Sequence, residues 1–299
     1  MTVRMGGLVS VTSGFAGAAG RMQIARGLQS LRNRAGLTLA QVADRSGFSK
    51  STVARYEGWQ DRAQIRWSTV KNIAEACGGK PEEIALLVKI AQAPDEGWWV
   101  GNSAVPEWMD PLVSFEQEAD YEHVYANTIV PGLLQTPAYA LATHQAQEVR
   151  IPAEEIERKV NARMQRQDIL KRQPPLHLWV VLDEAVLRRV VGNTAVMADQ
   201  LDHLRHMARQ PNIDLQVLPF TVGAHAAGSG GHFVLLGRDD ERHPLNSMAV
   251  AYIEMHRRGL YLDHPDDLRS YKVTFAYLRS QALNVSASEQ LLADVRKEY

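Results

Sequence analysis

The stretch RSGFSKSTVARYEGW, residues 45–59, decides the fold of the first part of the chain. Gly47 stands two positions before Ser49, and a short amphipathic run follows. Glycine takes up the positive φ of a tight turn without a side-chain penalty, and serine is a preferred N-cap of helices. The stretch therefore predicts a sharp turn and then a short helix in which Val53 and Tyr56 face inward.

Apolar residues at helical spacing precede this turn. Ile24, Leu28 and Leu31 lie on one face of an expected first helix, which Gly36 is in position to end. Thr38 can cap a second helix. The turn at residue 47 is therefore expected to join two helices that pack against a third.

Ala43, Gly47 and Val53 have the spacing of a helix-turn-helix corner. A small residue suits the place where two helices cross, the glycine forms the turn, and the branched residue packs between the helices. Any one of these residues is common, but together they indicate a helix-turn-helix domain.

Two further helices are expected after the corner. One would start from a cap at Ser68, and the other at Pro81, because proline favours the first turn of a helix. We expect Trp59 and Trp67 to pack in the core or beneath a loop. The expected result is an all-α domain of five helices.

The charge of the chain is unevenly distributed. The formal net charge is −1, yet residues 21–79 contain ten basic and four acidic side chains, a balance of +6. From residue 80 onward the balance is −8. A basic domain on an acidic body favours contact between the first domain and a polyanion.

A basic helix-turn-helix domain is typical of proteins that bind double-stranded DNA. The third helix would fit the major groove, where base edges present distinguishable donors and acceptors. With its apolar residues turned inward, four residues are left outward, and we expect them to read bases: Lys50, Ser51, Ala54 and Arg55. Phosphate contacts are expected from Thr38, Gln41, Ser49, Arg66 and Lys71. The alternative is that the basic residues only solvate a helix face.

The segment LRNRAGLTLAQVADRSGFSKSTVARYEG, residues 31–58, resembles the five-helix domain of lambdoid phage repressors and their bacterial relatives, the XRE family. The resemblance implies that Arg32 pairs with Glu57 at the end of the recognition helix. Relatives commonly open the second helix with a phosphate-binding glutamine, where this chain has Leu39. Thr38 or Gln41 are candidates to substitute for it.

Beyond residue 92 the pattern changes. A segment rich in tryptophan and proline precedes alternating helix and strand signals, which indicate a mixed α/β domain with helices covering a sheet. The fold class is thus α+β overall. We expect a tail at 1–20, the helix-turn-helix domain at 21–92, a connector at 93–111 that packs across the domain boundary, and a dimerisation and signal-receiving domain at 112–299.

Coarse signals place the elements of this second domain. A long charged helix is expected at 152–172, and a last helix with a capping box formed by Ser286 and Glu289. Helices are expected at 110–120, 137–147, 184–191 and 196–209, and strands at 121–131, 176–183, 213–220, 232–237 and 248–254.

Several strings of this second part resemble the DUF5753 domain that follows repressor-type domains in actinobacteria. They are IVPGLLQTPAYALA, RMQRQDIL, LDEAVLRRVVG, QLDHLRHMARQPNIDLQVLPF and GAHAAGSGGHFVLL. The resemblance implies a transcriptional regulator, sometimes described as antitoxin-like, often encoded beside a small acidic DUF397 protein. We expect a homodimer on an inverted-repeat operator, with a protein or an unidentified small molecule as its signal.

Two groups of residues raise the question of chemistry. The side chains Asp199, Asp202, His203 and His206 have a spacing that could gather a metal, although we expect them to form a solvated helix face. His225 and His232 bracket the string AAGSGG, which is either part of a ligand pocket or a flexible loop. The leading hypothesis is a regulator that is not an enzyme and needs no metal or cofactor. A DNA-targeted metal-dependent hydrolase and an antitoxin-like interaction protein remain alternatives.

Composition bounds the setting in which the protein works. The single cysteine, Cys77, excludes an internal disulfide and favours a reducing compartment. No apolar stretch approaches the roughly 18 residues that span a bilayer. We therefore expect a cytoplasmic protein without membrane contact.

Overall fold

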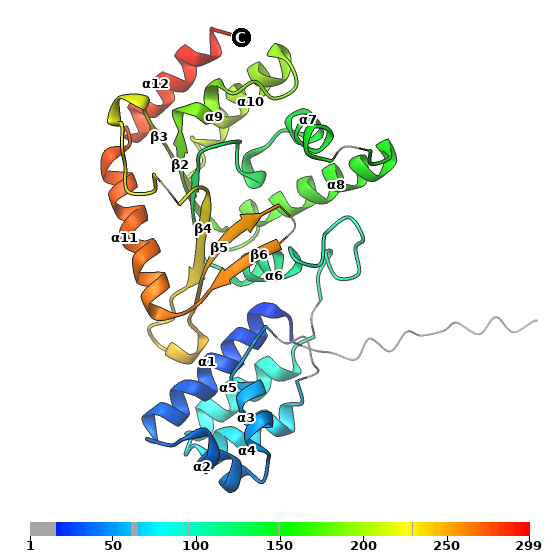
Figure 1. Cartoon of the computed structure of the whole chain (residues 1–299), viewed down its shortest axis with the longest axis vertical. Coiled ribbons are helices and arrows are strands. Elements are labelled where there is room, and N and C mark those ends of the chain that lie inside the picture. The colour runs from blue at the N-terminus through cyan, green and yellow to red at the C-terminus, as the bar shows by residue number, and fades with distance from the viewer. Residues whose placement is uncertain (1–15, 61–64, 95, 149, 229, 257) are drawn as a thin grey trace, which may run out of the picture. The chain divides into compact units, whose positions relative to one another are not determined.

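The computed structural model describes residues 16–60, 65–94, 96–148, 150–228, 230–256 and 258–299. The chain divides into two compact units, with the boundary between Gly97 and Trp98 (Figure 1). Residues 1–15 of the expected tail lie outside the described residues. The described part of the first unit contains helices and no strands: α1 (Ala18–Arg34), α2 (Leu39–Ser46), α3 (Lys50–Tyr56), α4 (Trp67–Ala76) and α5 (Pro81–Gln92).

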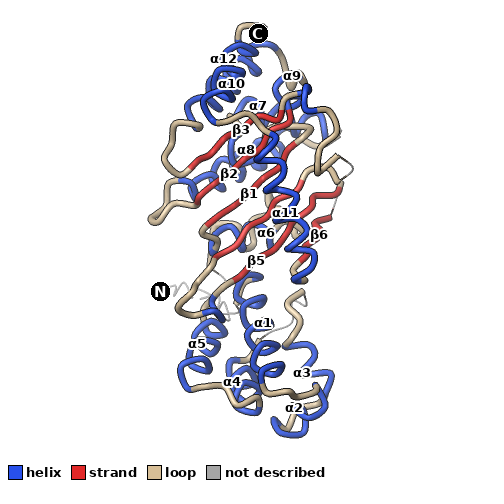
Figure 2. The backbone as a smooth tube through the Cα atoms, turned by 90° about the vertical axis from the view of Figure 1, so that its left-hand side faces the viewer, coloured by secondary structure: helices blue, strands red, loops and turns tan. Residues whose placement is uncertain are grey.

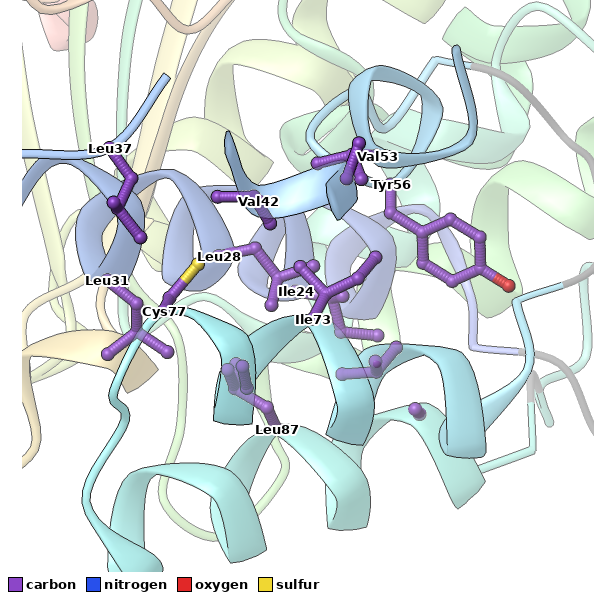
Figure 3. Packing of buried hydrophobic residues seen from close by; sticks show 14 of the residues in the cluster. Ile24, Leu28, Leu31, Leu37, Val42, Val53, Tyr56, Ile73, Cys77 and Leu87 are labelled. Atoms are coloured by element: carbon purple, nitrogen blue, oxygen red, sulfur yellow. The ribbon is translucent and has the colours of Figure 1, made fainter. Parts of the chain in front are cut away.

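The core of the first unit lies between α1 and the four shorter helices. Ile24, Leu28 and Leu31 of α1 have no exposed surface, as predicted from their spacing. Figure 3 shows them in one cluster that also contains Val53 of α3 and Ile73 of α4. Burying such side chains contributes about 1.5–3 kcal/mol each. The corner formed by α2 and α3 therefore packs against α1 and α4.

The turn between α2 and α3 forms as predicted. Thr38 and Gln41 form a capping box, in which the Thr38 hydroxyl accepts the Gln41 N–H at 3.3 Å and the Gln41 side chain accepts the Thr38 N–H at 2.9 Å. Gly47 ends α2 with φ at 74°. The Ser49 hydroxyl caps α3 by accepting the Thr52 N–H at 3.1 Å. Local sequence thus sets both helix starts and the corner between them.

Three details of the first unit differ from the predictions. Helix α1 begins at Ala18, so the last residues of the expected tail form its first turn. Helix α4 begins at Trp67 with Arg66 as its N-cap, and the predicted Ser68 cap is wrong. The Tyr56 hydroxyl accepts the Arg66 N–H at 3.0 Å, which fixes the helix start before the serine. Trp59 is buried as expected, whereas Trp67 is 47% exposed and does not pack in the core.

The second unit contains a six-stranded mixed sheet among the described residues, in the order β3-β2-β1-β4-β5-β6. The strands are β1 (Tyr121–Ala126), β2 (His177–Asp183), β3 (Ile213–Leu218), β4 (Phe233–Arg238), β5 (Met248–Met255) and β6 (Arg258–Leu262). The α-helices are α6 (Asp110–Glu118), α7 (Pro137–Gln147), α8 (Ala153–Arg166), α9 (Glu184–Arg188), α10 (Thr194–Met207), α11 (Pro265–Gln281) and α12 (Val285–Arg296). Short 3-10 turns include η1 (Gly132–Leu134) and η2 (Gln167–Leu170).

The sheet changes direction at β1. Strands β1, β2 and β3 are parallel, whereas β4 is antiparallel to β1 and continues into an antiparallel β4–β5–β6 meander. Helix α11 crosses one face of the sheet (Figure 2). On this face Phe275 packs with Tyr125 and Phe233. Helices α6 and α8 lie on the other face (Figure 1). The predicted α+β fold class is confirmed.

Most of the expected connector packs inside the second unit. Trp99 and Val105 are buried and form a cluster with Val113 of α6 and Ala162 of α8. Residues 98–109 thus help to cover α6 and α8. This part of the expected connector therefore contributes to the core of the second unit.

Two elements of the second unit were not predicted, and several others have different bounds: the strand expected at 121–131 ends at Ala126, and the helix expected at 184–191 ends at Arg188. Strand β6 and helix α11 were not predicted. The long charged helix ends at Arg166 and continues as η2 up to Leu170. Helix α12 begins one residue before Ser286, because the Asn284 side chain accepts the Ala287 N–H at 2.8 Å and acts as the cap. The predicted Ser286–Glu289 capping box is therefore wrong.

Replacing Gly47 tests the local origin of the corner. At φ 74° an added Cβ meets no atom within 4 Å, so Gly47→Ala introduces only backbone strain. We expect a loss of about 1 kcal/mol in the stability of the α2–α3 corner. Hydrogen–deuterium exchange of residues 39–56 measures it. Gly58→Ala is the control, since its Cβ would make ordinary contacts from 3.6 Å at a position without positive φ. Equal exchange in the two variants would contradict the strain argument.

Candidate nucleic-acid interface

The outward face of α3 carries the four residues expected to read bases. Lys50, Ser51, Ala54 and Arg55 are all exposed, while Val53 and Tyr56 of the same helix are buried. Because α3 is only seven residues long, its two buried side chains fix which face points outward. The helix thus presents two cations, a hydroxyl and a methyl group on one side.

Lys50 and Arg55, the two cations of this face, form no ion pair with a described residue. Among the described residues, no carboxylate lies within ion-pair distance of Lys50 or Arg55. The guanidinium of Arg55 lies 5.6 Å from the centre of the Tyr56 ring, which limits the directions it can take. Two forked N–H groups on such a side chain match the acceptors of a guanine edge.

An ion pair fastens the end of α3 to α1. Arg32 Nε donates to Glu57 Oε1 at 2.7 Å, and Nη2 donates to Oε2 at 2.8 Å. Arg32 also reaches the Leu37 carbonyl at 3.1 Å, and Gln29 donates to the Glu57 carbonyl at 2.9 Å. The hydrogen bonds to Glu57 raise the pKa of Arg32. The expected Arg32–Glu57 pairing is confirmed, and it sets the tilt of α3 on the domain.

The residues expected to meet phosphates have different settings. Thr38, Gln41 and Ser49 are exposed, but their side chains already cap α2 and α3. Arg66 is exposed at the start of α4. Lys71 is exposed on α4 and lies 3.7 Å from Glu75. Arg66 is therefore the cation of this set with the fewest competing contacts.

One exposed side chain beside this set was not expected from sequence. Trp67 follows Arg66 and opens α4, and nearly half of its surface is exposed. The sequence shows that a tryptophan follows an arginine at a helix start. This pattern does not reveal whether the ring is exposed or lies in the core. The structure adds Trp67 to the candidate surface.

The two histidines that bracket the glycine-rich string meet different groups. His225 Nε2 lies 3.3 Å from the Tyr125 hydroxyl, on the side of the sheet that α11 covers. His232 is half-buried, and burial lowers its pKa to about 4, against a smaller raising effect from a hydrogen bond to the Tyr125 backbone. Arg166 also lowers it. The ring of His232 is therefore neutral near pH 7.

Two of the residues considered as metal ligands, Asp202 and His203 of α10, have different surroundings in the structure. Asp202 Oδ2 accepts from Arg296 Nε at 2.8 Å. His203 is half-buried with its Nε2 inside the protein, which corrects the expectation of a fully solvated face. No three acidic, histidine or cysteine side chains of the described residues come together as a metal site would require.

Comparison with known families agrees with this division of the chain. A model described as a helix-turn-helix domain matches residues 23–87. A model described as a domain of unknown function, DUF5753, matches residues 109–294. The chain belongs to the DUF5753 family. The expected order of a helix-turn-helix domain and then a DUF5753 domain is confirmed, and it supports a DNA-binding regulator.

No curated protein and no solved structure matches the DUF5753 protein described here. None of the helices in the described part of the chain has both the length and the hydropathy needed to cross a membrane.

Removing the carboxylate of Glu57 tests the ion pair. Glu57 is buried and the Arg32 side chain is 20% exposed, so Glu57→Ala leaves a largely shielded guanidinium without its partner. We expect a loss of about 1.5–3 kcal/mol in the stability of the first domain. Urea unfolding, monitored by hydrogen–deuterium exchange of the α1 and α3 amides, measures this loss of stability. Glu82→Ala, at an exposed position of α5, is the control, and an equally small effect of both variants would refute the assignment.

Proposed function

We propose that this protein is a sequence-specific transcriptional regulator that places α3 in the major groove of DNA. The observation that carries the proposal is the exposed α3 face with two cations that lack ion-pair partners among the described residues. In this assignment Arg55 binds a guanine, and Lys50 binds a guanine or a phosphate. Ser51 makes a less selective base contact, and Ala54 touches a thymine methyl.

Phosphate contacts would orient the domain on the duplex. Arg66 and Lys71 supply cations from α4, while the N–H groups near Thr38 and Ser49 supply neutral donors at two helix starts. Such contacts carry no sequence information and make affinity depend on salt. The balance of +6 in residues 21–79 supports this role.

We further propose that the regulator acts as a homodimer whose DUF5753 domain receives the signal. The signal comes from a protein partner, for which a small acidic DUF397-type protein is the implied candidate, or from a small ligand. We place its action in the cytoplasm, because DNA is its ligand. The DUF5753 domain would thereby change the affinity of the helix-turn-helix domain for its operator.

Two arginine variants separate base reading from backbone binding. Arg55→Ala should weaken binding by about 1–3 kcal/mol and relax specificity at one base position. Arg66→Ala should weaken binding to all sequences alike and lower the slope of affinity against salt by about one. Fluorescence anisotropy with matched and mismatched duplexes measures both effects. Lys89→Ala, exposed on α5, is the control. A uniform loss from Arg55→Ala would remove it from the base-reading set.

Selection of bound fragments from random DNA tests the proposal as a whole. A dimer with two recognition helices should select an inverted repeat whose half-sites are about 34 Å apart, or a multiple of that distance. Failure of the full chain to bind any duplex at low salt would overturn the function. Selection of one unpaired half-site at every protein concentration would overturn the dimer alone.

A further inference from the structure

Two strings that carry the DUF5753 resemblance meet on the face of the sheet where α8 lies. Gly132 and Gln135 come from the first string, and Arg163, Arg166 and Gln167 come from the second. The Gln167 side chain donates to the carbonyls of Gly132 at 2.9 Å and of Gln135 at 2.8 Å. The function proposed above uses none of these residues.

Arg166 is a buried cation with a complete partner. Its Nε donates to Glu116 Oε2 at 2.7 Å, and its Nη2 donates to the other carboxylate oxygen of Glu116. Both side chains are buried, so this pair has no net charge within the protein interior. Removing one partner of such a pair is strongly destabilising, because it leaves the other charge buried and uncompensated. Arg166 therefore has a structural role.

Three further polar groups, Glu122, Tyr252 and His232, interact with Arg166. Burial raises the pKa of the Glu122 carboxyl well above its usual range, which favours its neutral form. One of its oxygens and the Tyr252 hydroxyl are buried without a hydrogen-bond partner among the described residues. His232 is neutral for the reason given above. Arg163 is a further cation beside this group, and the carboxylates whose charge acts on it, Glu254 and Glu148, lie beyond ion-pair distance.

Arg163 lies one helical turn before Arg166 but has no anionic partner. Its Nη1 donates to Gln135 Oε1 at 2.7 Å, and Gln135 is a neutral side chain. Among the described residues, no carboxylate lies within ion-pair distance of Arg163. Burial and the nearby Arg166 lower the pKa of Arg163 to about 10. Placing a guanidinium here is thus unfavourable for the isolated protein.

The surroundings hold Arg163 in place, and part of the residue's surface remains exposed. Gln135 is buried and its side chain also donates to the Val130 carbonyl at 2.7 Å. Gly132 brings its backbone close to the arginines, since a Cβ there would come within 3.2 Å of Arg166 Nη1. Arg163 itself is only half-buried. A guanidinium that is held in place and has no carboxylate within ion-pair distance is suited to binding an oxyanion.

We propose that Arg163, positioned by Gln135 and Gly132, anchors a site in the DUF5753 domain for a small oxyanion, a carboxylate or a phosphate. The anion supplies the negative charge that the fold gives to Arg166 through Glu116 but does not give to Arg163. Binding itself is independent of DNA. Only its use as the regulatory signal rests on the function proposed above.

Hydrogen–deuterium exchange on the full chain tests the site with two probes, inorganic phosphate and citrate, each compared with chloride at equal ionic strength. We expect at least one of them to slow exchange in residues 129–136 and 159–170 in a saturable way. Arg163→Gln should raise the apparent dissociation constant about tenfold or more, the effect of losing a charge-assisted hydrogen bond. Arg158→Gln, exposed on the same helix, is the matched control and should behave as the unchanged chain.

The same variants distinguish a ligand anchor from a structural arginine. Without anion, Arg163→Gln should melt at the same temperature as the unchanged chain or higher, because it removes a desolvated charge repelled by Arg166. A lower melting temperature together with anion protection that does not depend on residue 163 would overturn the proposal. So would protection confined to residues 39–58, where the anion would occupy the DNA-binding face. Arg55→Ala should leave the effect intact, so loss of DNA binding and loss of anion binding are read separately.

Discussion

The bidentate ion pair of Arg32 and Glu57 is the interaction on which the DNA-binding surface depends. It joins α1 to the residue directly after α3, so the last turn of α3 cannot swing away from the core. Val53 and Tyr56 then fix its rotation. A helix of seven residues has little stability of its own, and its direction therefore comes from these contacts. The outward residues therefore owe their common face to side chains that lie in the core or in the ion pair.

The second domain also combines apolar packing with a buried ion pair, here on the two faces of a sheet. Its sheet changes from parallel to antiparallel at β1, so β1 has neighbours of both kinds and is buried on both faces. The face toward α11 is lined by rings such as Tyr125, Phe233 and Phe275. The face toward α8 instead contains the Arg166–Glu116 pair and Glu122, whose pKa burial raises. Buried polar groups of this kind cost stability unless they are paired, which marks this face as the place to look for a ligand.

Sequence reasoning predicted the first domain well because its signals are local. Caps at Thr38 and Ser49 and the turn at Gly47 depend on neighbouring residues, and all three formed. Ser68 failed as a cap because a hydroxyl from Tyr56, twelve residues earlier, decides where α4 begins. Trp67 was misjudged because exposure depends on the finished surface. These errors share a cause, since each was decided by a contact that the local pattern does not contain.

The second domain was harder to predict for the same reason. Helix α11 has apolar residues at Leu268, Phe275 and Leu278, but exposed Val273 and Tyr277 on its other side hide the pattern. Strand β6 is a short edge strand that contains Gly259, where a Cβ would come within 2.6 Å of the Tyr252 ring. Both elements are recognisable only once their packing partners are known.

Three arginines show why the partner of a side chain, and not its type, decides its role. Arg32 is matched by a carboxylate and holds two helices together. Arg55 has no carboxylate within ion-pair distance among the described residues and is exposed, so that hydration compensates its charge. Arg163 has neither full hydration nor a carboxylate, only the oxygen of Gln135. A cation in that third setting keeps its cost in the free protein, and an incoming anion removes that cost on binding. The fold therefore favours the bound state of the second domain through a charge that it leaves unmatched.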